Sequence, residues 1–289
     1  MALPLFNKNR FPSGTQHEMG FMDHLDVLRW HLMRAVIAIL IFAILIFINI
    51  DWVFDTIIYG PMRADFITYT GLCKLGQRFH IGDALCMPAP NVSMQVTTFG
   101  SQFMSSISIS VIGGFMVAFP YVFWELWRFI RPALSVNEIK NTRGAIFGVT
   151  FFFVLGISFG YFLLAPFTFS FLSNFKIGTL QALETKPTLD DYIENMIDII
   201  TGTGLAFELP VISFVLTKIG LITPKLLKDI RRFAYLVILF VAAVITPSPD
   251  WMSQLLVAIP LIILYEISII ISGRVVKDET KKAIDFFSN

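Results

Sequence analysis

Charged residues are scarce in this chain, since Asp, Glu, Lys and Arg make up only 15% of its 289 residues. Soluble globular domains contain about 25% of these residues, and here 55% of the chain is apolar or aromatic. This balance excludes a disordered chain and a nucleic-acid-binding domain. It predicts an all-α polytopic membrane protein, whose long apolar runs cross the lipid bilayer as helices.

Cysteine is almost absent, with only Cys73 and Cys86 in the whole chain. Two cysteines are too few for a cysteine-based metal cage or an iron–sulfur cluster. In an oxidising compartment the two would close a small ring that adds on the order of 3 kcal/mol to stability. A disulfide and two free thiols are both open at this stage.

Recognisable catalytic motifs are also missing. The sequence contains no phosphate-binding loop, dinucleotide fingerprint, H-E-x-x-H or G-x-S-x-G. His17, His24 and His31 recur every seven residues, which separates neighbours by about 10 Å along a helix and keeps them from sharing one ion. We therefore expect no enzyme, no cofactor and no metal site, and interpret these histidines as the polar face of an amphipathic helix.

What the chain does contain is six apolar stretches, separated by charged residues. The fifth has 13 residues, about 20 Å of helix against a hydrocarbon core of about 30 Å, so it predicts a locally thinned membrane. The stretches cover residues 34–50, 102–124, 145–166, 192–216, 233–245 and 252–271.

Lysine and arginine are distributed unevenly among the connecting segments. Of the 22 basic residues, 17 lie in the N-terminal segment up to Arg34 or follow the second, fourth and sixth stretches. By the positive-inside rule both termini are cytoplasmic. Residues 1–289 then form a single membrane domain, and residues 51–101 form a long periplasmic loop whose apolar pieces suit the membrane surface.

Glu208 lies inside the fourth stretch, about 15 Å along a helix from Lys218. A carboxylate near the middle of the bilayer should face a cavity, a partner helix or a proton path, and a structural hydrogen bond to a neighbouring span is the simpler alternative. Glu125 and Arg128 are spaced as an ion pair at a helix end.

Small residues recur at helical spacing and predict close packing between helices. They are the serine stripe Ser101, Ser105 and Ser108 and the glycine pair Gly156 and Gly160.

Several stretches together resemble the TatC subunit of the twin-arginine protein translocase, in an order and on membrane sides that agree with the predicted topology. They lie within residues 21–273 and are HLDVLR at 24–29, FIRPAL at 129–134, NE at 137–138, FELPV at 207–211, TPSPD at 246–250, SQ at 253–254 and AIPL at 258–261.

This resemblance implies a cup-shaped six-helix fold in the bacterial cytoplasmic (inner) membrane and export of folded proteins driven by the proton-motive force. The implied partners are twin-arginine signal peptides, TatA/TatB-type single-span subunits and further copies of the chain. Signal-peptide binding falls on Arg29, Phe129 and Glu138, and contact with single-span subunits falls on Glu208. Structural residues of the outer side are Pro61, Pro247, Asp250 and Gln254.

One position departs from the family pattern. Val27 stands where a glutamate is usual, and the nearest acid is Asp26, about 100° away around a helix. Asp26 is therefore a further candidate for the binding site, although Glu138 is the stronger one. From the residues alone, a secondary transporter or proton-coupled channel with Glu208 as its ion site is the alternative function, and an intramembrane enzyme ranks third.

Overall fold

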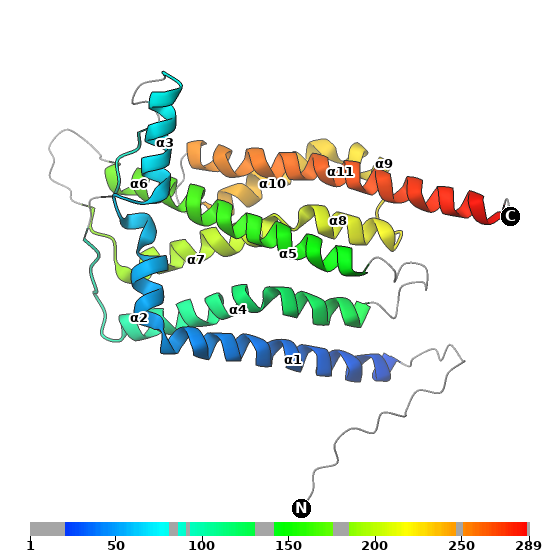
Figure 1. Ribbon diagram of the computed structural model, residues 1–289, viewed down its shortest axis with the longest axis horizontal. Helices are drawn as coiled ribbons and strands as arrows, with labels where there is room; N and C mark the ends of the chain where they lie inside the picture. The colour runs from blue at the N-terminus through cyan, green and yellow to red at the C-terminus, as the bar shows by residue number, and fades with distance from the viewer. Residues whose placement is uncertain are drawn as a thin grey trace, which may run out of the picture.

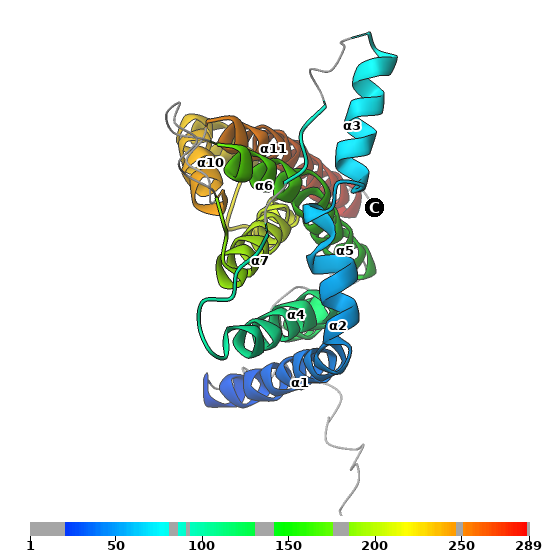
Figure 2. The same cartoon turned by 90° about the vertical axis from the view of Figure 1, so that its left-hand side faces the viewer.

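The computed structural model describes residues 21–80, 86–90, 93–130, 142–175, 185–246 and 251–287. Within these ranges the regular structure is helical, apart from one isolated bridge between Gln95 and Thr188. The long helices run side by side (Figure 1), and a view along them separates α1 and α4 from the group around α7, α10 and α11 (Figure 2). The all-α class predicted from the apolar stretches is confirmed.

The first two spans are single helices. α1 (Phe21–Ile48) packs along α4 (Ser101–Ile130), and α4 in turn contacts α7. The third span is α5 (Thr142–Phe159) continued by the π-helical turn η6 (Gly160–Leu164) and α6 (Ala165–Asn174). It therefore runs past the predicted end at residue 166, because Pro166 stands in the first turn of α6, where its missing N–H costs no hydrogen bond.

The fourth span is broken. α7 (Leu189–Ala206) and α8 (Leu209–Lys218) meet at Phe207 and Glu208, and a proline stands in the first turn of α8. The last elements are α9 (Pro224–Asp229), α10 (Arg231–Ile245) and α11 (Trp251–Phe287).

Five of the six spans are long and apolar enough to cross a bilayer at full thickness. They are Asp26–Ile48, Ser101–Phe129, Ile146–Asn174, Leu189–Lys218 and Ser253–Lys277. The remaining span, the fifth along the chain, is α10, whose 15 residues extend about 22 Å. It contains the short stretch predicted at 233–245, and its length is below the thickness of an unperturbed hydrocarbon core.

The bundle has two distinct ends (Figure 1). We call the end where α1 begins and α11 finishes the terminal end. At the opposite end, the cap end, lie α2 (Ile50–Val53), the π-helical turn η1 (Phe54–Ile58), the 3₁₀ turn η2 (Gly60–Met62) and α3 (Ile67–Arg78). These elements stand across the ends of the long helices (Figures 1 and 2).

Tyrosine side chains fix the cap to the bundle. The hydroxyl of Tyr161 donates to the carbonyl of Ile57 at 2.8 Å, and that of Tyr192 donates to the carbonyl of Ile58 at 2.5 Å. The side chain of Ile58 is buried in the same core as that of Met196 on α7. This part of the 51–101 segment therefore packs on the helix ends, where sequence reasoning expected it to lie on the membrane surface.

A third tyrosine links the cap to α6. The Tyr69 hydroxyl lies 2.9 Å from the carbonyl oxygen of Pro61 and 3.2 Å from that of Pro166 on α6. Burial raises the pKa of Tyr69, so the phenol keeps its proton and remains a donor. Pro61 is itself buried in η2.

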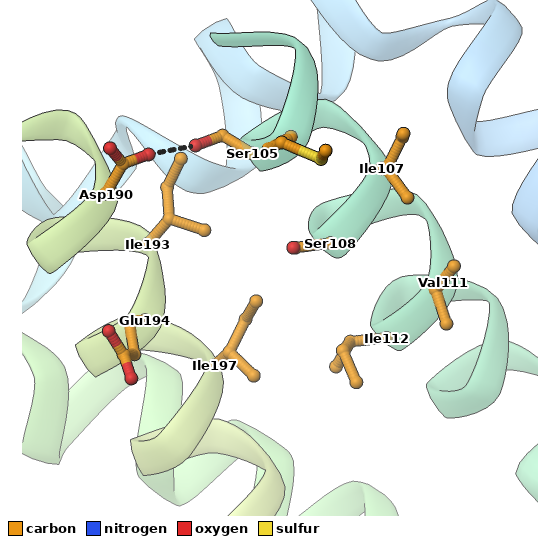
Figure 3. A pocket seen from close by; sticks show the side chains of 10 residues that line it. Ser105, Ile107, Ser108, Val111, Ile112, Asp190, Ile193, Glu194 and Ile197 are labelled. Carbon is orange, nitrogen blue, oxygen red and sulfur yellow. Dashed lines mark hydrogen bonds between the residues drawn. The ribbon is translucent and has the colours of Figure 1, made fainter. Parts of the chain in front are cut away.

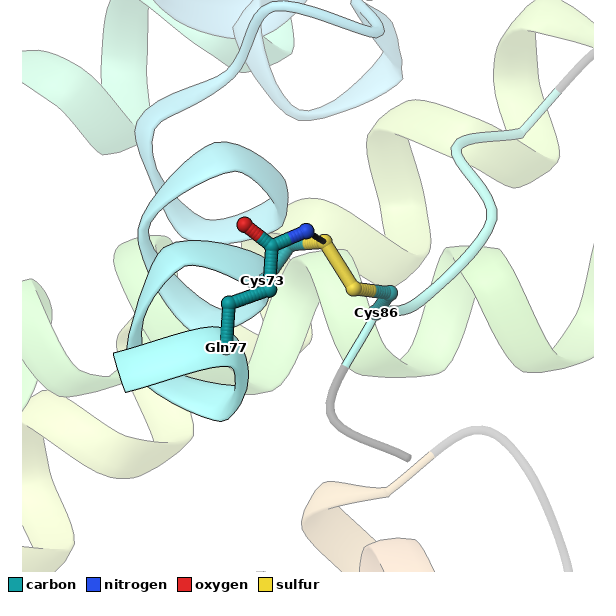
Figure 4. The surroundings of a disulfide bond; sticks show 3 residues. All are labelled: Cys73, Gln77 and Cys86. Carbon is teal, nitrogen blue, oxygen red and sulfur yellow. Dashed lines mark hydrogen bonds between the residues drawn. A yellow bond between two sulfur atoms is a disulfide. The ribbon is translucent and has the colours of Figure 1, made fainter. Parts of the chain in front are cut away.

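A disulfide joins Cys73 on α3 to Cys86, with their Cα atoms 4.2 Å apart (Figure 4). The bond closes a ring with a sequence separation of 13 residues. α3 extends away from the bundle in Figure 1, and this covalent link ties the segment after it back to the helix.

The glycine pair predicted from the sequence lies where the third span meets α7, with Gly156 on α5 and Gly160 at the start of η6. A Cβ atom added at Gly156 would stand 2.6 Å from the carbonyl oxygen of Thr203. Only a residue without a side chain allows the two backbones to approach this closely.

Candidate functional site

The terminal end holds three of the four residues predicted to bind a signal peptide. Asp26 and Arg29 are exposed on α1, and Phe129 is half-buried in the last turn of α4. The ring of Phe129 meets the imidazole of His31 edge to face, with centroids 6.4 Å apart. Glu138, the fourth, lies outside the described residues.

Beside Phe129 lies Glu125, a fully buried carboxylate with only 2% of its side chain exposed. Its Oε2 is 2.5 Å from Nδ1 of His31, and its Oε1 accepts a hydrogen bond of 3.0 Å from the Tyr121 hydroxyl. His31 comes from α1 and Tyr121 from α4, so the carboxylate joins the two helices next to the predicted binding surface.

Two arginines complete this group, which we call the Glu125 cluster (Glu125, His31, Tyr121, Arg34 and Arg128). Nη1 of Arg34 lies 3.5 Å and Nη1 of Arg128 lies 3.6 Å from the carboxylate oxygens. The predicted helix-end pair with Arg128 is therefore present, but it is the longest of four contacts. Sequence reasoning missed the rest, although His31 and Arg34 share one face of α1 at a spacing of three residues.

Glu208 occupies the break between α7 and α8. Its backbone N–H donates to the carbonyl of Leu205, and its own carbonyl accepts from the N–H groups of Val211 and Ile212. The side chain is 6% exposed, and Oε1 is buried without a hydrogen-bond partner among the described residues. Among the described residues, the structural hydrogen bond considered from the sequence is not formed by this oxygen, which leaves Oε1 able to accept one.

The serine stripe lies opposite two acidic residues of α7, Asp190 and Glu194 (Figure 3). Ser101 and Ser105 donate to the two carboxylate oxygens of Asp190 at 2.5 and 2.9 Å, which links α4 to α7. Ser101 and Ser105 therefore act in helix packing, as the spacing predicted, but through hydrogen bonds to a carboxylate, whereas Ser108 is exposed. Sequence reasoning passed over Glu194 and Asp198, which are exposed on the following turns of α7.

The residues predicted as structural on the outer side are only partly described. Gln254 on α11 donates from Nε2 to the carbonyl of Leu239 at 3.0 Å, which ties α11 to the short helix α10. Pro247 and Asp250 lie outside the described residues. Among the residues that the structure does describe, no three His, Cys, Asp or Glu side chains are grouped as metal ligands.

Comparison with known proteins identifies the family. The profile described as Sec-independent protein translocase protein (TatC) matches residues 23–260. A protein named Sec-independent protein translocase protein TatC from Blattabacterium sp. subsp. Periplaneta americana (strain BPLAN) is 41% identical over 263 residues, covering 91% of this chain and 98% of the relative. The protein of the same name from Aquifex aeolicus (strain VF5) is 32% identical over 268 residues, covering 92% and 100%.

Two solved structures agree with this assignment. A crystal structure titled Twin Arginine Translocase Receptor- TatC superposes with a TM-score of 0.66 at 30% identity and covers 88% of this chain and 99% of that one. A second, described as TatC in DDM, gives a TM-score of 0.68 at 31% identity and covers 86% and 99%. The fold and the resemblance predicted from the sequence are confirmed, and the chain belongs to the TatC family of Sec-independent protein translocase proteins.

Proposed function

We propose that this protein is the receptor and core subunit of a twin-arginine translocase. It binds Arg-Arg signal peptides at the terminal end and, with TatA/TatB-type single-span subunits and further copies of itself, exports folded proteins at the expense of the proton-motive force. The observation that carries the proposal is family membership along nearly the whole chain, from residue 23 to residue 260.

The terminal end offers the chemistry that such a signal peptide needs. A guanidinium group pairs with a carboxylate through two parallel hydrogen bonds, which an ammonium group cannot form. Glu138 is our candidate for that carboxylate, with Asp26 as the second acid of the surface. Phe129, held against His31, supplies an apolar contact for the residues that follow the arginines, and Arg29 is exposed on α1.

We further propose the bacterial inner membrane as the location, with both termini in the cytoplasm. The ends of α4 and α8 and the beginnings of α1 and α10 lie toward the terminal end (Figure 1) and carry basic residues. The positive-inside rule places such a distribution in the cytoplasm. Residues 1–289 then act as one membrane domain, with 51–101 in the periplasm. A fluorescent protein fused to the C-terminus should fold and fluoresce in cells, and a fusion active only when exported would contradict this orientation.

The first test is binding of a labelled Arg-Arg signal peptide to the purified protein in lipid nanodiscs. We expect specific binding that weakens by about tenfold or more in Glu138→Ala, because a bidentate charged pair is worth more than 1.4 kcal/mol. A Lys-Lys peptide should bind weakly and be far less sensitive to the substitution. Glu194→Gln, at the opposite end of the bundle, is the matched control. Equal losses for both peptides would remove the bidentate argument.

We assign Glu208 to a step that follows signal-peptide binding, in which a polar group of a single-span subunit approaches the unpartnered Oε1. Glu208→Ala should leave signal-peptide binding largely intact and lower export of a folded reporter protein. Unimpaired export by this variant would contradict the assignment. The alternative of a secondary transporter predicts proton flux through the protein alone, which a pH-sensitive dye inside proteoliposomes measures directly.

A further inference from the structure

The helix α3 stands across the bundle at the cap end, and its far end extends beyond the long helices (Figures 1 and 2). One flank of this helix is attached to the rest of the chain. The Thr68 hydroxyl donates to the carbonyl of Phe162, and the Tyr69 hydroxyl donates to the carbonyls of Pro61 and Pro166. The other flank of α3 is exposed.

The exposed flank separates apolar from basic side chains. Ile67, Leu75 and Phe79 fall on one row of every fourth residue, and they are 65%, 47% and 67% exposed. Lys74 and Arg78 are exposed on the adjoining row. α3 contains no aspartate or glutamate, so its charge is positive. A helix with this division lies in the plane of a membrane interface, with its apolar side chains among the lipids and its basic side chains at the headgroups.

The contacts of α3 also fix its depth along the spans. Phe162, which accepts the hydrogen bond from Thr68, lies sixteen residues after Ile146, where the third span begins, and twelve residues of that span follow it. Sixteen helical residues extend about 24 Å, against a hydrocarbon core of about 30 Å. A core that begins at Ile146 therefore ends about 6 Å beyond Phe162, and α3 begins at that boundary.

The exposed surface of α3 is continuous with an exposed apolar surface of the third span. Leu155 and Phe162 lie two turns apart on that span and are 42% and 46% exposed. The ring of Phe66, the N-cap of α3, stacks on that of Phe162 with centroids 6.0 Å apart. Lipid that covers Phe162 therefore reaches the first turn of α3, where Ile67 is exposed.

The disulfide leaves the apolar row free. Cys73 precedes Leu75 by two residues, which places it about 160° away around the helix. Its partner Cys86 leads to Pro88, whose carbonyl accepts a hydrogen bond of 2.7 Å from Ser170 on α6 (Figure 4). The covalent link therefore attaches α3 to the bundle through the flank that does not carry the apolar row.

We propose that α3 binds the surface of the lipid leaflet on the side of the cap end, with Ile67, Leu75 and Phe79 inserted between the lipids and Lys74 and Arg78 paired with anionic phospholipid headgroups. The inference goes beyond the proposed function, because it requires only the bilayer that the spans cross, and its tests do not involve a signal peptide. A second copy of the chain is the competing occupant, but two facing α3 helices would oppose like charges.

The first test measures the depth of α3 in the full chain, with one copy in each nanodisc of phosphatidylcholine and phosphatidylglycerol. Gly71 belongs to the apolar row, and a Cβ atom added there meets no described atom within 4 Å. Gly71→p-acetylphenylalanine carries a nitroxide spin label and leaves both cysteines in their disulfide. Electron paramagnetic resonance then measures collisions of the label with oxygen, which dissolves in lipid, and with a water-soluble nickel chelate.

Gln77→p-acetylphenylalanine is the matched control, because Gln77 is exposed on the same helix about 120° away from Gly71. We expect the label at position 71 to lose most of its collisions with nickel and to keep those with oxygen, and the label at position 77 to keep both. Equal accessibility of the two labels to nickel would overturn the proposal. Shielding at position 71 that appears only in discs with two copies would also overturn it, in favour of self-association.

Lys74→Gln and Arg78→Gln test the role of the charge. One basic residue near an anionic surface is worth about a fivefold change in population, so each substitution should speed amide hydrogen exchange in the second half of α3 by up to about fivefold in discs with phosphatidylglycerol. In discs of phosphatidylcholine alone neither should have an effect. Lys74→Arg keeps the charge and should exchange like the unsubstituted chain. If the unsubstituted chain exchanges equally fast in both lipids, pairing with anionic headgroups is refuted.

Discussion

The Glu125 cluster gives the sharpest prediction, because its stability and its effect on binding can both be measured. Glu125 is 2% exposed and His31 is 13% exposed, with 2.5 Å between their closest atoms. A hydrogen bond to a charged group contributes about 1.5–3 kcal/mol, and removing one member of a buried ion pair costs about 3–5 kcal/mol. Arg34 and Arg128 are 45% and 46% exposed, and exposed pairs add at most about 1 kcal/mol.

We therefore expect Glu125→Ala to lower the free energy of unfolding by about 3 kcal/mol and His31→Ala by about 2 kcal/mol. The double variant should lose less than the sum of the two, which gives a coupling energy of about 1.5 kcal/mol. The assay is equilibrium unfolding in mixed micelles of increasing SDS content, followed by tryptophan fluorescence.

The pair of Glu266 with Arg231 supplies the matched control. Its atoms are 2.8 Å apart, but its side chains are 35% and 45% exposed, so Arg231→Ala should cost less than about 1 kcal/mol. A coupling energy between His31 and Glu125 below about 0.5 kcal/mol, or one no larger than the control, would refute the reasoning. Because His31 contacts Phe129, we also expect His31→Ala to weaken binding of an Arg-Arg signal peptide.

Two further predictions concern packing and the cap. Gly156→Val should force α5 away from the Thr203 carbonyl and cost about 1–3 kcal/mol of stability by overpacking. Gly148→Ala, whose added Cβ has its nearest neighbour at 4.0 Å, should not lower the unfolding midpoint, because Ala is favoured over Gly inside a helix. Equal losses in the two variants would contradict the close-approach argument. Cys73→Ser should open the ring closed with Cys86 and destabilise the cap by up to about 3 kcal/mol. We expect faster amide hydrogen exchange in α3 and unchanged binding of the signal peptide. Unaltered exchange would contradict the role given to the disulfide.

The sequence by itself determined the helical elements, and it predicts their direction through the membrane. Every backbone polar group in lipid must be paired within its own helix, so an apolar stretch of sufficient length specifies a spanning helix without reference to its neighbours. The basic residues at the ends of the stretches predict sidedness in the same local way. For this reason the shortness of α10 and the unusual position of Glu208 between Gly204 and Pro210 could be predicted from the sequence.

Only the tertiary structure decided which helix faces meet. His31 and Glu125 are 94 residues apart in the chain, and Ser105 and Asp190 are 85 apart. Helical periodicity assigns each residue to a face but does not pair that face with another. Between helices in lipid no hydrophobic driving force selects partners, so close packing and polar contacts decide the arrangement. For this reason the Glu125 cluster and the docking of the cap on Tyr192 became visible only in the folded chain.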